Sequence, residues 1–308
     1  MDRLQKQKTS ESPQKNRIIG YICGITAGIA FGLNPFFGLP LLQEYELSVN
    51  TVLLCRYEIG MLLLGIWILI RRQSFKINAQ QCGRLCCLGI LFALSSSFLF
   101  SAYGSIPSGI ATTIVFLCPI LVALIMCFFK VYPTWQVWIS VVLTFIGVAL
   151  LCQPDPAAAF HWSGILLAFL SALAYAFFII IVNRSRALKG MSNILLTFYA
   201  LLFGGIVFLL RADFQDFLKI TDLKVGLCLL GLTLLPTLVS TITLAAATKR
   251  IGATQACVLG VFEPITAIGI GVLLFKEPLN FSIILGLFLT MFAIIFMAIS
   301  ESKAKSVT

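Results

Sequence analysis

The chain has 308 residues, of which 59% are hydrophobic and 11% are charged, and its formal net charge is +10. A soluble domain needs a more polar surface than this composition supplies, so we expect an integral membrane protein. The apolar runs are long and do not alternate with polar residues as membrane β-strands do, which favours an all-α membrane protein.

A transmembrane helix needs about 20 predominantly apolar residues. Ten segments approach that length, at 18–40, 48–70, 84–103, 108–129, 134–152, 162–182, 192–210, 223–247, 251–275 and 280–299. The polar residues before and after them predict a disordered cytoplasmic tail at 1–17 and a second cytoplasmic tail at 301–308.

The positive charge is distributed unevenly over the predicted loops. With the N-terminus inside, most basic residues outside the spans lie on the inner side, and the outer side holds only Arg211, Lys219, Lys224 and Lys276. This asymmetry predicts that both termini are cytoplasmic. The charge therefore orients the protein in a lipid bilayer and does not indicate a nucleic-acid partner.

The first span carries Gly20, Gly24, Gly28 and Gly32 at intervals of four residues. That spacing predicts a face on which another helix backbone packs closely, either within the subunit or in a second subunit. Asn34-Pro35 then interrupts the helix. The interruption is either a simple kink or part of a surface that faces a ligand.

The second span contains Arg56, Tyr57 and Glu58, and ionisable residues inside a membrane are costly. Positions two apart point to nearly opposite faces of a helix, so Arg56 and Glu58 are not expected to pair with each other. At least one of them needs a partner on another helix. The alternative for Arg56 is that its side chain extends to the lipid headgroups.

Hydroxyl groups concentrate in the third span, where Ser97, Ser101 and Gly104 form one stripe. This stripe either faces a cavity or serves helix packing. Tyrosines inside spans are candidates for the wall of a substrate pocket, although aromatic side chains in spans more often face lipid. The tyrosines concerned are Tyr57, Tyr103, Tyr175 and Tyr199.

Residues 105–133 and 250–278 are similar without a gap. Ile106 and Ile251, Pro119 and Pro264, and Pro133 and Pro278 are each 145 residues apart. We infer a duplicated unit with halves at 18–152 and 162–300, joined by an external linker at 153–161. Because each half has an odd number of spans, the second half must cross the membrane in the opposite sense. Inverted 5+5 repeats are typical of secondary transporters.

Only the second copy has an acid beside the shared proline, at Glu263. It lies about 18 Å from either end of its predicted span, too deep to reach the headgroups. A carboxyl group without a partner at that depth is expected to stay protonated, which makes Glu263 a candidate for coupling transport to protons. The alternative is a structural acid satisfied by Arg56 or by hydroxyl groups. Four prolines are predicted as kinks or hinges: Pro35, Pro119, Pro236 and Pro264.

These features together resemble the EamA-type carriers of the drug/metabolite transporter superfamily. The resemblance rests on Lys249-Arg250, Gly252-Ala253, Glu263-Pro264 and Glu277 in order, and on Ile106 to Pro119 and Arg56 in the first half. It implies a ten-helix inverted-repeat carrier in a bacterial inner membrane that works by alternating access and exports amino acids or related metabolites. The first repeat departs from the pattern, because Lys130-Val131-Tyr132 stands where the family often has an acid.

We therefore expect a secondary transporter of a small-molecule substrate, with protons as the coupling ion and no enzymatic activity. The alternative is a flippase or a carrier of a lipid, nucleobase or sugar conjugate with the same fold. No metal or cofactor is expected, because Cys82, Cys86 and Cys87 have no histidine near them and match no zinc spacing. A channel is not favoured, because no loop is long enough to re-enter the membrane. The sequence leaves the oligomeric state open.

Overall fold

The computed structural model describes residues 13–130, 135–151, 161–188, 190–211, 216–220, 222–251, 256, 258–277 and 279–307. Within these ranges the regular structure is helical and no strand occurs. Several positions used in the sequence argument lie outside them, namely Val131, Tyr132, Pro133, residues 153–160, Gly252, Ala253 and Pro278.

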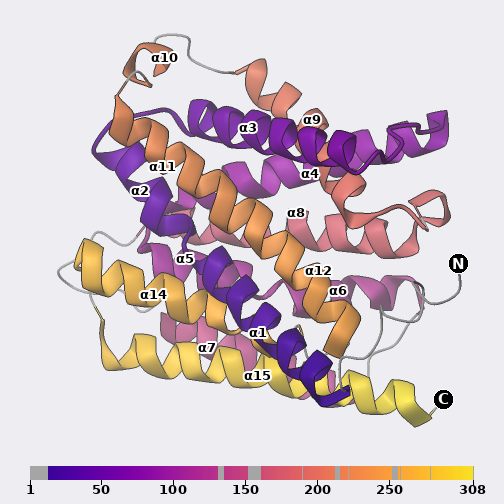
Figure 1. Ribbon diagram of the computed structural model, residues 1–308. Coiled ribbons are helices and arrows are strands. Elements are labelled where there is room, and N and C mark those ends of the chain that lie inside the picture. The colour runs from indigo at the N-terminus through magenta and orange to yellow at the C-terminus, as the bar shows by residue number, and fades with distance from the viewer. Residues whose placement is uncertain are drawn as a thin grey trace, which may run out of the picture.

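The first half consists of α1 (Pro13–Gly32), α2 (Asn34–Gln43), α3 (Val49–Ile70), α4 (Ala79–Tyr103), α5 (Ser108–Val115), α6 (Cys118–Phe128) and α7 (Trp135–Leu151). The second half consists of α8 (Trp162–Arg184), η2 (Arg186–Leu188), α9 (Asn193–Leu209), α10 (Asp216–Lys219), α11 (Leu223–Thr233), η3 (Leu234–Val239), α12 (Ser240–Ile251), α14 (Phe262–Phe275) and α15 (Phe281–Val307). The start of α1 and the end of α15 lie at the same end of the bundle (Figure 1).

Six helical stretches of the described chain are long and apolar enough to cross a membrane: Gln14–Gln43, Val49–Ile70, Ala79–Tyr103, Ser108–Phe128, Trp162–Arg184 and Leu223–Ile251. Four further apolar helices are shorter: Trp135–Leu151, Asn193–Leu209, Phe262–Phe275 and Phe281–Met297. These stretches follow the order of the predicted segments. The protein is thus a multi-pass helical membrane protein, and the count of ten crossings stays a prediction.

Helix boundaries differ from the predicted ones in several places, of which two change the expected position of residues named above. The first helix begins at Pro13, so the last residues of the predicted disordered tail are helical. The predicted continuous helix over 251–275 is wrong, because α14 begins only at Phe262, after a turn at Gly260 and Val261. As a result Glu263 lies in the first turn of a helix, whereas the sequence suggested the middle of one.

The glycine stripe of α1 packs inside the subunit. A Cβ atom on Gly28 would meet Phe262 and the backbone of Glu263, and one on Gly32 would overlap Thr266 and the carbonyl of Glu263. Because these glycines lack a side chain, the α1 backbone lies directly against the start of α14. The four-residue spacing therefore serves this contact, and the intersubunit alternative is not needed to explain it.

Corresponding helices of the two halves make equivalent contacts with the opposite half. α1 packs on α12 in the way that α8 packs on α4, while α3 packs on α9, α5 on α14 and α7 on α15. The exchange extends to single residues: Gly20 lies against Ile251, and Gly164 lies against Ile106, the corresponding isoleucine of the first copy. The duplicated sequence thus forms two halves that make equivalent contacts with each other.

Candidate functional site

Glu263 lies at the break that opens α14, where α1 and α2 pass close to it. Its side chain is half-buried. Among the described residues, its carboxylate accepts no hydrogen bond and forms no ion pair. The backbone N–H of Glu263 donates to the Gly260 carbonyl at 2.9 Å, and Pro264 has no N–H, so neither position offers a free donor to the carboxylate. The carboxyl group of Glu263 is therefore without a hydrogen-bonding or ion-pair partner in the described structure.

Two tyrosines lie within electrostatic range of the Glu263 carboxylate, Tyr103 on α4 and Tyr175 on α8. The Tyr103 hydroxyl is 3.3 Å from the Thr112 hydroxyl of α5. Tyr175 also lies within range of Cys118, which stands 145 residues before Glu263 and occupies the first turn of α6. Glu263 and the residue at the corresponding position of the first half thus both lie within electrostatic range of Tyr175.

Arg56 is only 6% exposed. Its Nε donates a hydrogen bond of 2.8 Å to the Thr237 hydroxyl, and its Cζ lies 5.7 Å from the centroid of the Phe100 ring. Tyr103 lies within electrostatic range of Arg56 as well as of Glu263. The side chain thus turns into the protein and does not extend to the lipid headgroups.

Glu58 faces a different neighbour from Arg56, as the spacing on the helix predicts. A Cβ atom on Gly205 of α9 would collide with the Glu58 carboxylate, so this acid lies on the α3–α9 contact. Glu58 is half-buried and forms no ion pair within the described part of the chain. Its position is separate from the Arg56–Thr237 contact.

Two predicted pocket tyrosines instead hold helices together. The Tyr57 hydroxyl bonds to the Phe92 carbonyl at 3.0 Å and to Ser96 at 2.8 Å, and its ring packs edge-on against Phe208. The Tyr199 hydroxyl donates to the carbonyl of Phe75 at 2.6 Å, in the connection between α3 and α4. Neither tyrosine shares the neighbourhood of Glu263.

The serines of α4 differ in whether they form hydrogen bonds to other residues. Ser95 and Ser171 of α8 are joined by a hydrogen bond of 2.7 Å from the Ser171 hydroxyl to the Ser95 carbonyl, which secures the α4–α8 contact. Ser97 and Ser101 are half-buried and have no hydrogen-bond partner among the described residues. The latter pair remains available to a solute.

Asn34 begins α2 immediately after the helix break at Leu33. Its Nδ2 donates to the Phe31 carbonyl at 2.9 Å, which covers part of the backbone freed by the break. Its Oδ1 is buried and has no hydrogen-bond partner in the described structure. An unsatisfied buried acceptor is unusual in a folded protein.

The four predicted hinge prolines all lie at irregular points of the helices. Pro35 follows the α1–α2 break, and Pro119 and Pro264 occupy the first turns of α6 and α14. Pro236 lies within the π-helical turn η3, between α11 and α12. Proline is tolerated in a first turn because its missing N–H is not needed there, whereas inside a helix it disrupts the hydrogen-bond ladder.

Two acids of the second half bind the start of helices of the first half, which the sequence did not reveal. Glu277 accepts hydrogen bonds from the backbone N–H and the hydroxyl of Ser108, the first residue of α5. Asp216 accepts from the backbone N–H of Ser48, the residue that caps α3. Both pairs lie on the side predicted to be external. The only signal in the sequence was a serine at the start of each helix, Ser48 before α3 and Ser108 as the first residue of α5, and a serine does not identify the acid.

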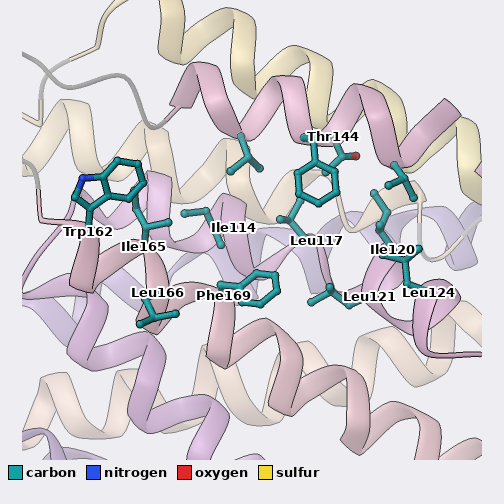
Figure 2. A pocket seen from close by; sticks show the side chains of 13 residues that line it. Ile114, Leu117, Ile120, Leu121, Leu124, Thr144, Trp162, Ile165, Leu166 and Phe169 are labelled. Atoms are coloured by element: carbon teal, nitrogen blue, oxygen red, sulfur yellow. The ribbon is translucent and has the colours of Figure 1, made fainter. Parts of the chain in front are cut away.

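An apolar cavity of about 270 Å³ lies elsewhere, between α5–α6, α7 and α8 (Figure 2). It is lined by Ile114, Leu117, Ile120, Leu121, Leu124, Val141, Thr144, Phe145, Val148, Trp162, Ile165, Leu166 and Phe169. Trp162 and Phe145 are 73% and 67% exposed, so the cavity opens on the lipid-facing surface. None of the residues predicted for the site lines it.

The fold and site define a multi-pass helical membrane protein with a buried arginine and a half-buried acid near the junction of two equivalent halves. The chain belongs to the EamA-like transporter family, whose model matches residues 18–153 and 162–299. One similar solved structure, titled "Crystal structure of protein", superposes with a TM-score of 0.59 at 14% identity, over 91% of this chain and 98% of that chain. That similarity establishes the fold alone. No significant match was found among curated proteins.

Proposed function

We propose that this membrane transporter is a secondary carrier that exports or exchanges a small metabolite, such as an amino acid or a related amphipathic solute. The observation that carries the proposal is the position of Glu263, an acid without a partner among the described residues at the junction of the two halves. A carboxyl group in such a place can bind and release a proton without disrupting the packing around it. We assign proton coupling to Glu263.

The two halves would form an inverted repeat of five helices each and exchange access between the sides of the membrane. The helix breaks at Pro35, Pro119 and Pro264 and the π-turn at Pro236 are the points at which the helices would bend. The Glu277–Ser108 and Asp216–Ser48 hydrogen bonds link the halves on the external side. These links would have to break or move with their helices when that side opens.

Charge compensation would alternate between states. In one state Arg56 would pair with Glu263, and in the other a bound solute would replace this contact. Glu58 would form an ion pair with an ammonium group of the solute in one of the states. Alternation of this kind is supported by the absence of an ion pair for each of these three side chains in the described structure.

The substrate class is tested by thermal denaturation of the purified full-length protein with amino acids, nucleosides and sugar conjugates. A ligand that binds the native state raises the melting temperature by mass action. We expect stabilisation by solutes of the amino-acid class, and loss or weakening of that stabilisation in Glu263→Gln. Glu44→Gln is the matched control, because Glu44 is exposed. Stabilisation by nucleosides or sugar conjugates alone would contradict the proposed solute.

The lipid-facing cavity of Figure 2 favours the second candidate, a carrier of a lipid or lipid-like conjugate with a lateral opening. Vesicles that contain a fluorescent phospholipid and the reconstituted protein test it, with dithionite quenching only the outer leaflet. Faster quenching of the inner-leaflet fraction than in protein-free vesicles would favour the flippase. We expect no acceleration.

The location in a bacterial inner membrane with both termini cytoplasmic is part of the proposal. It is tested by fusing green fluorescent protein or alkaline phosphatase to the C-terminus. Fluorescence without phosphatase activity is expected, because the phosphatase folds only outside the cytoplasm, and the reverse result would invert the topology.

A further inference from the structure

Arg56 is a buried cation whose hydrogen-bonding capacity is only partly used. Its Nε donates to Thr237, and its guanidinium lies over the Phe100 ring. In the described part of the chain, the two terminal nitrogens make no hydrogen bond and no carboxylate pairs with them. Leaving a buried charge unpaired is unfavourable by several kcal/mol. The site therefore calls for a negatively charged partner that the described residues do not supply in this conformation.

Thr237 fixes the orientation of Arg56 through the π-turn η3. Pro236 has no N–H, so it cannot donate to the carbonyl of Leu232, four residues earlier, as a helical residue would. The Thr237 hydroxyl donates its proton to this carbonyl, at 3.3 Å, and accepts the Arg56 Nε–H at 2.8 Å. One hydroxyl thus connects the irregular helix to the guanidinium. π-turns of this kind are frequent at functional sites.

The nitrogens that remain free define the chemistry of the partner. With Nε engaged, the Nη1 and Nη2 groups offer parallel N–H donors on the other edge of the guanidinium plane. That arrangement matches the two oxygens of a carboxylate or a comparable small oxyanion. Tyr103 lies within electrostatic range of both Arg56 and Glu263.

We propose that Arg56 is the anion subsite of the transport site, binding a substrate carboxylate or similar oxyanion, and that Thr237 is the positioning residue for it. This inference rests on the proposed transport function and specifies one part of the substrate. It explains why a π-turn with a proline and a threonine faces a buried arginine. Phe100 supports the guanidinium face and leaves its edge open.

The test compares binding of acids and their amides by the full-length protein in detergent, with leucine, phenylalanine and 3-phenylpropionate beside leucinamide, phenylalaninamide and 3-phenylpropionamide. We expect the acids to bind and the amides to bind about tenfold more weakly. Thr237→Val keeps the side-chain shape and removes the hydroxyl, so it should reduce the acid-to-amide ratio, and Thr237→Ser should restore it. A purely structural role would weaken acids and amides equally.

Thr233→Val is the matched control, because Thr233 is a fully buried threonine whose hydroxyl bonds only to the Leu229 carbonyl of its own helix. It should leave the acid-to-amide ratio unchanged. Equal binding of acids and amides, an unchanged ratio in Thr237→Val, or no binding of any acid would each overturn the subsite. Proton-driven transport is measured separately, so a carrier that moves solutes without favouring acids would refute the subsite and leave the transport function intact.

Discussion

The carboxylate of Glu277 accepts two hydrogen bonds from Ser108, one from the backbone N–H at 2.8 Å and one from the hydroxyl at 2.7 Å. The contact joins Glu277, the second residue after the end of α14, to the first residue of α5, in the other half of the chain. Lys276, in a left-handed conformation with φ of 52°, ends α14 and turns the chain so that Glu277 follows immediately. An acid at the start of a helix satisfies N–H groups that have no helical partner.

Replacing Glu277 with Gln should lower the free energy of unfolding by about 1–2 kcal/mol, because hydrogen bonds to a charged acceptor are stronger than neutral ones. Thermal denaturation in detergent measures the effect, with Glu44→Gln as the control for loss of an exposed charge. An unchanged melting temperature would mean that the contact does not hold the two halves together.

The carboxyl group of Asp216 predicts that the stability of the protein depends on pH. Partial burial acts to raise the pKa of Asp216, but hydrogen bonds from Ser48, Thr51 and Lys219 outweigh it and hold the pKa below its ordinary value of 3.8. A carboxyl group with a lowered pKa in the folded state stabilises the protein above its unfolded pKa, and this contribution disappears as the pH falls through the folded pKa. The melting temperature should therefore fall on acidification below about pH 4.

Asp216→Asn removes this contribution, so the difference in melting temperature between the native protein and the variant should shrink as the pH is lowered. A series of buffers from about pH 6 to pH 3 measures it. A difference that stays constant over the series would show that the charge of Asp216 is not responsible.

Gly32 permits the close approach of α1 to α14. A Cβ atom there would lie 2.5 Å from the Thr266 Cβ and 2.6 Å from the Glu263 carbonyl oxygen, so the helices would have to separate. Gly32→Ala should destabilise the protein by about 1–3 kcal/mol, the usual penalty for overpacking. Gly83→Ala is the control, because a Cβ on Gly83 meets no atom within 4 Å. Equal melting temperatures of the two variants would contradict the packing of the glycine stripe.

Tyr175 and Tyr199 are predicted to differ in role, Tyr175 in transport and Tyr199 in stability. Tyr175 lies near Glu263, whereas the Tyr199 hydroxyl bonds to the Phe75 carbonyl. Tyr175→Phe should change transport with little change in stability. Tyr199→Phe should cost about 1 kcal/mol of stability, one neutral hydrogen bond, and leave transport per folded molecule unchanged. The two variants are compared by transport in proteoliposomes, normalised to folded protein, and by melting temperature. An identical response of both variants would contradict the difference in role.

Much of the helical framework follows from the sequence. The offset of 145 residues between Ile106 and Ile251 identifies two halves. In the structure each isoleucine packs against a glycine in the first helix of the other half, Ile106 against Gly164 and Ile251 against Gly20. Asn34-Pro35 indicates the break after α1, because proline ends or kinks a helix. The spacing of Arg56 and Glu58 predicts separate partners, which helix geometry alone requires.

The long-range partners of the site could not be predicted. Thr237 is 181 residues from Arg56, and its role depends on how the π-turn orients its hydroxyl in three dimensions. Tyr57 and Tyr199 both lie inside predicted spans and look like pocket residues in sequence, yet packing directs both hydroxyls to backbone carbonyls. A kink was predicted at Pro264, but the break itself lies at Gly260 and Val261, which are not distinctive in an apolar segment.

The central claim, that Glu263 carries the coupled proton, is tested most directly by proton flux in proteoliposomes that enclose a pH-sensitive dye. Addition of a solute identified by thermal stabilisation should change the internal pH with the native protein and with Glu44→Gln. Glu263→Gln should abolish this change while solute exchange at equal pH continues. A solute-dependent pH change of normal size in Glu263→Gln would contradict the account.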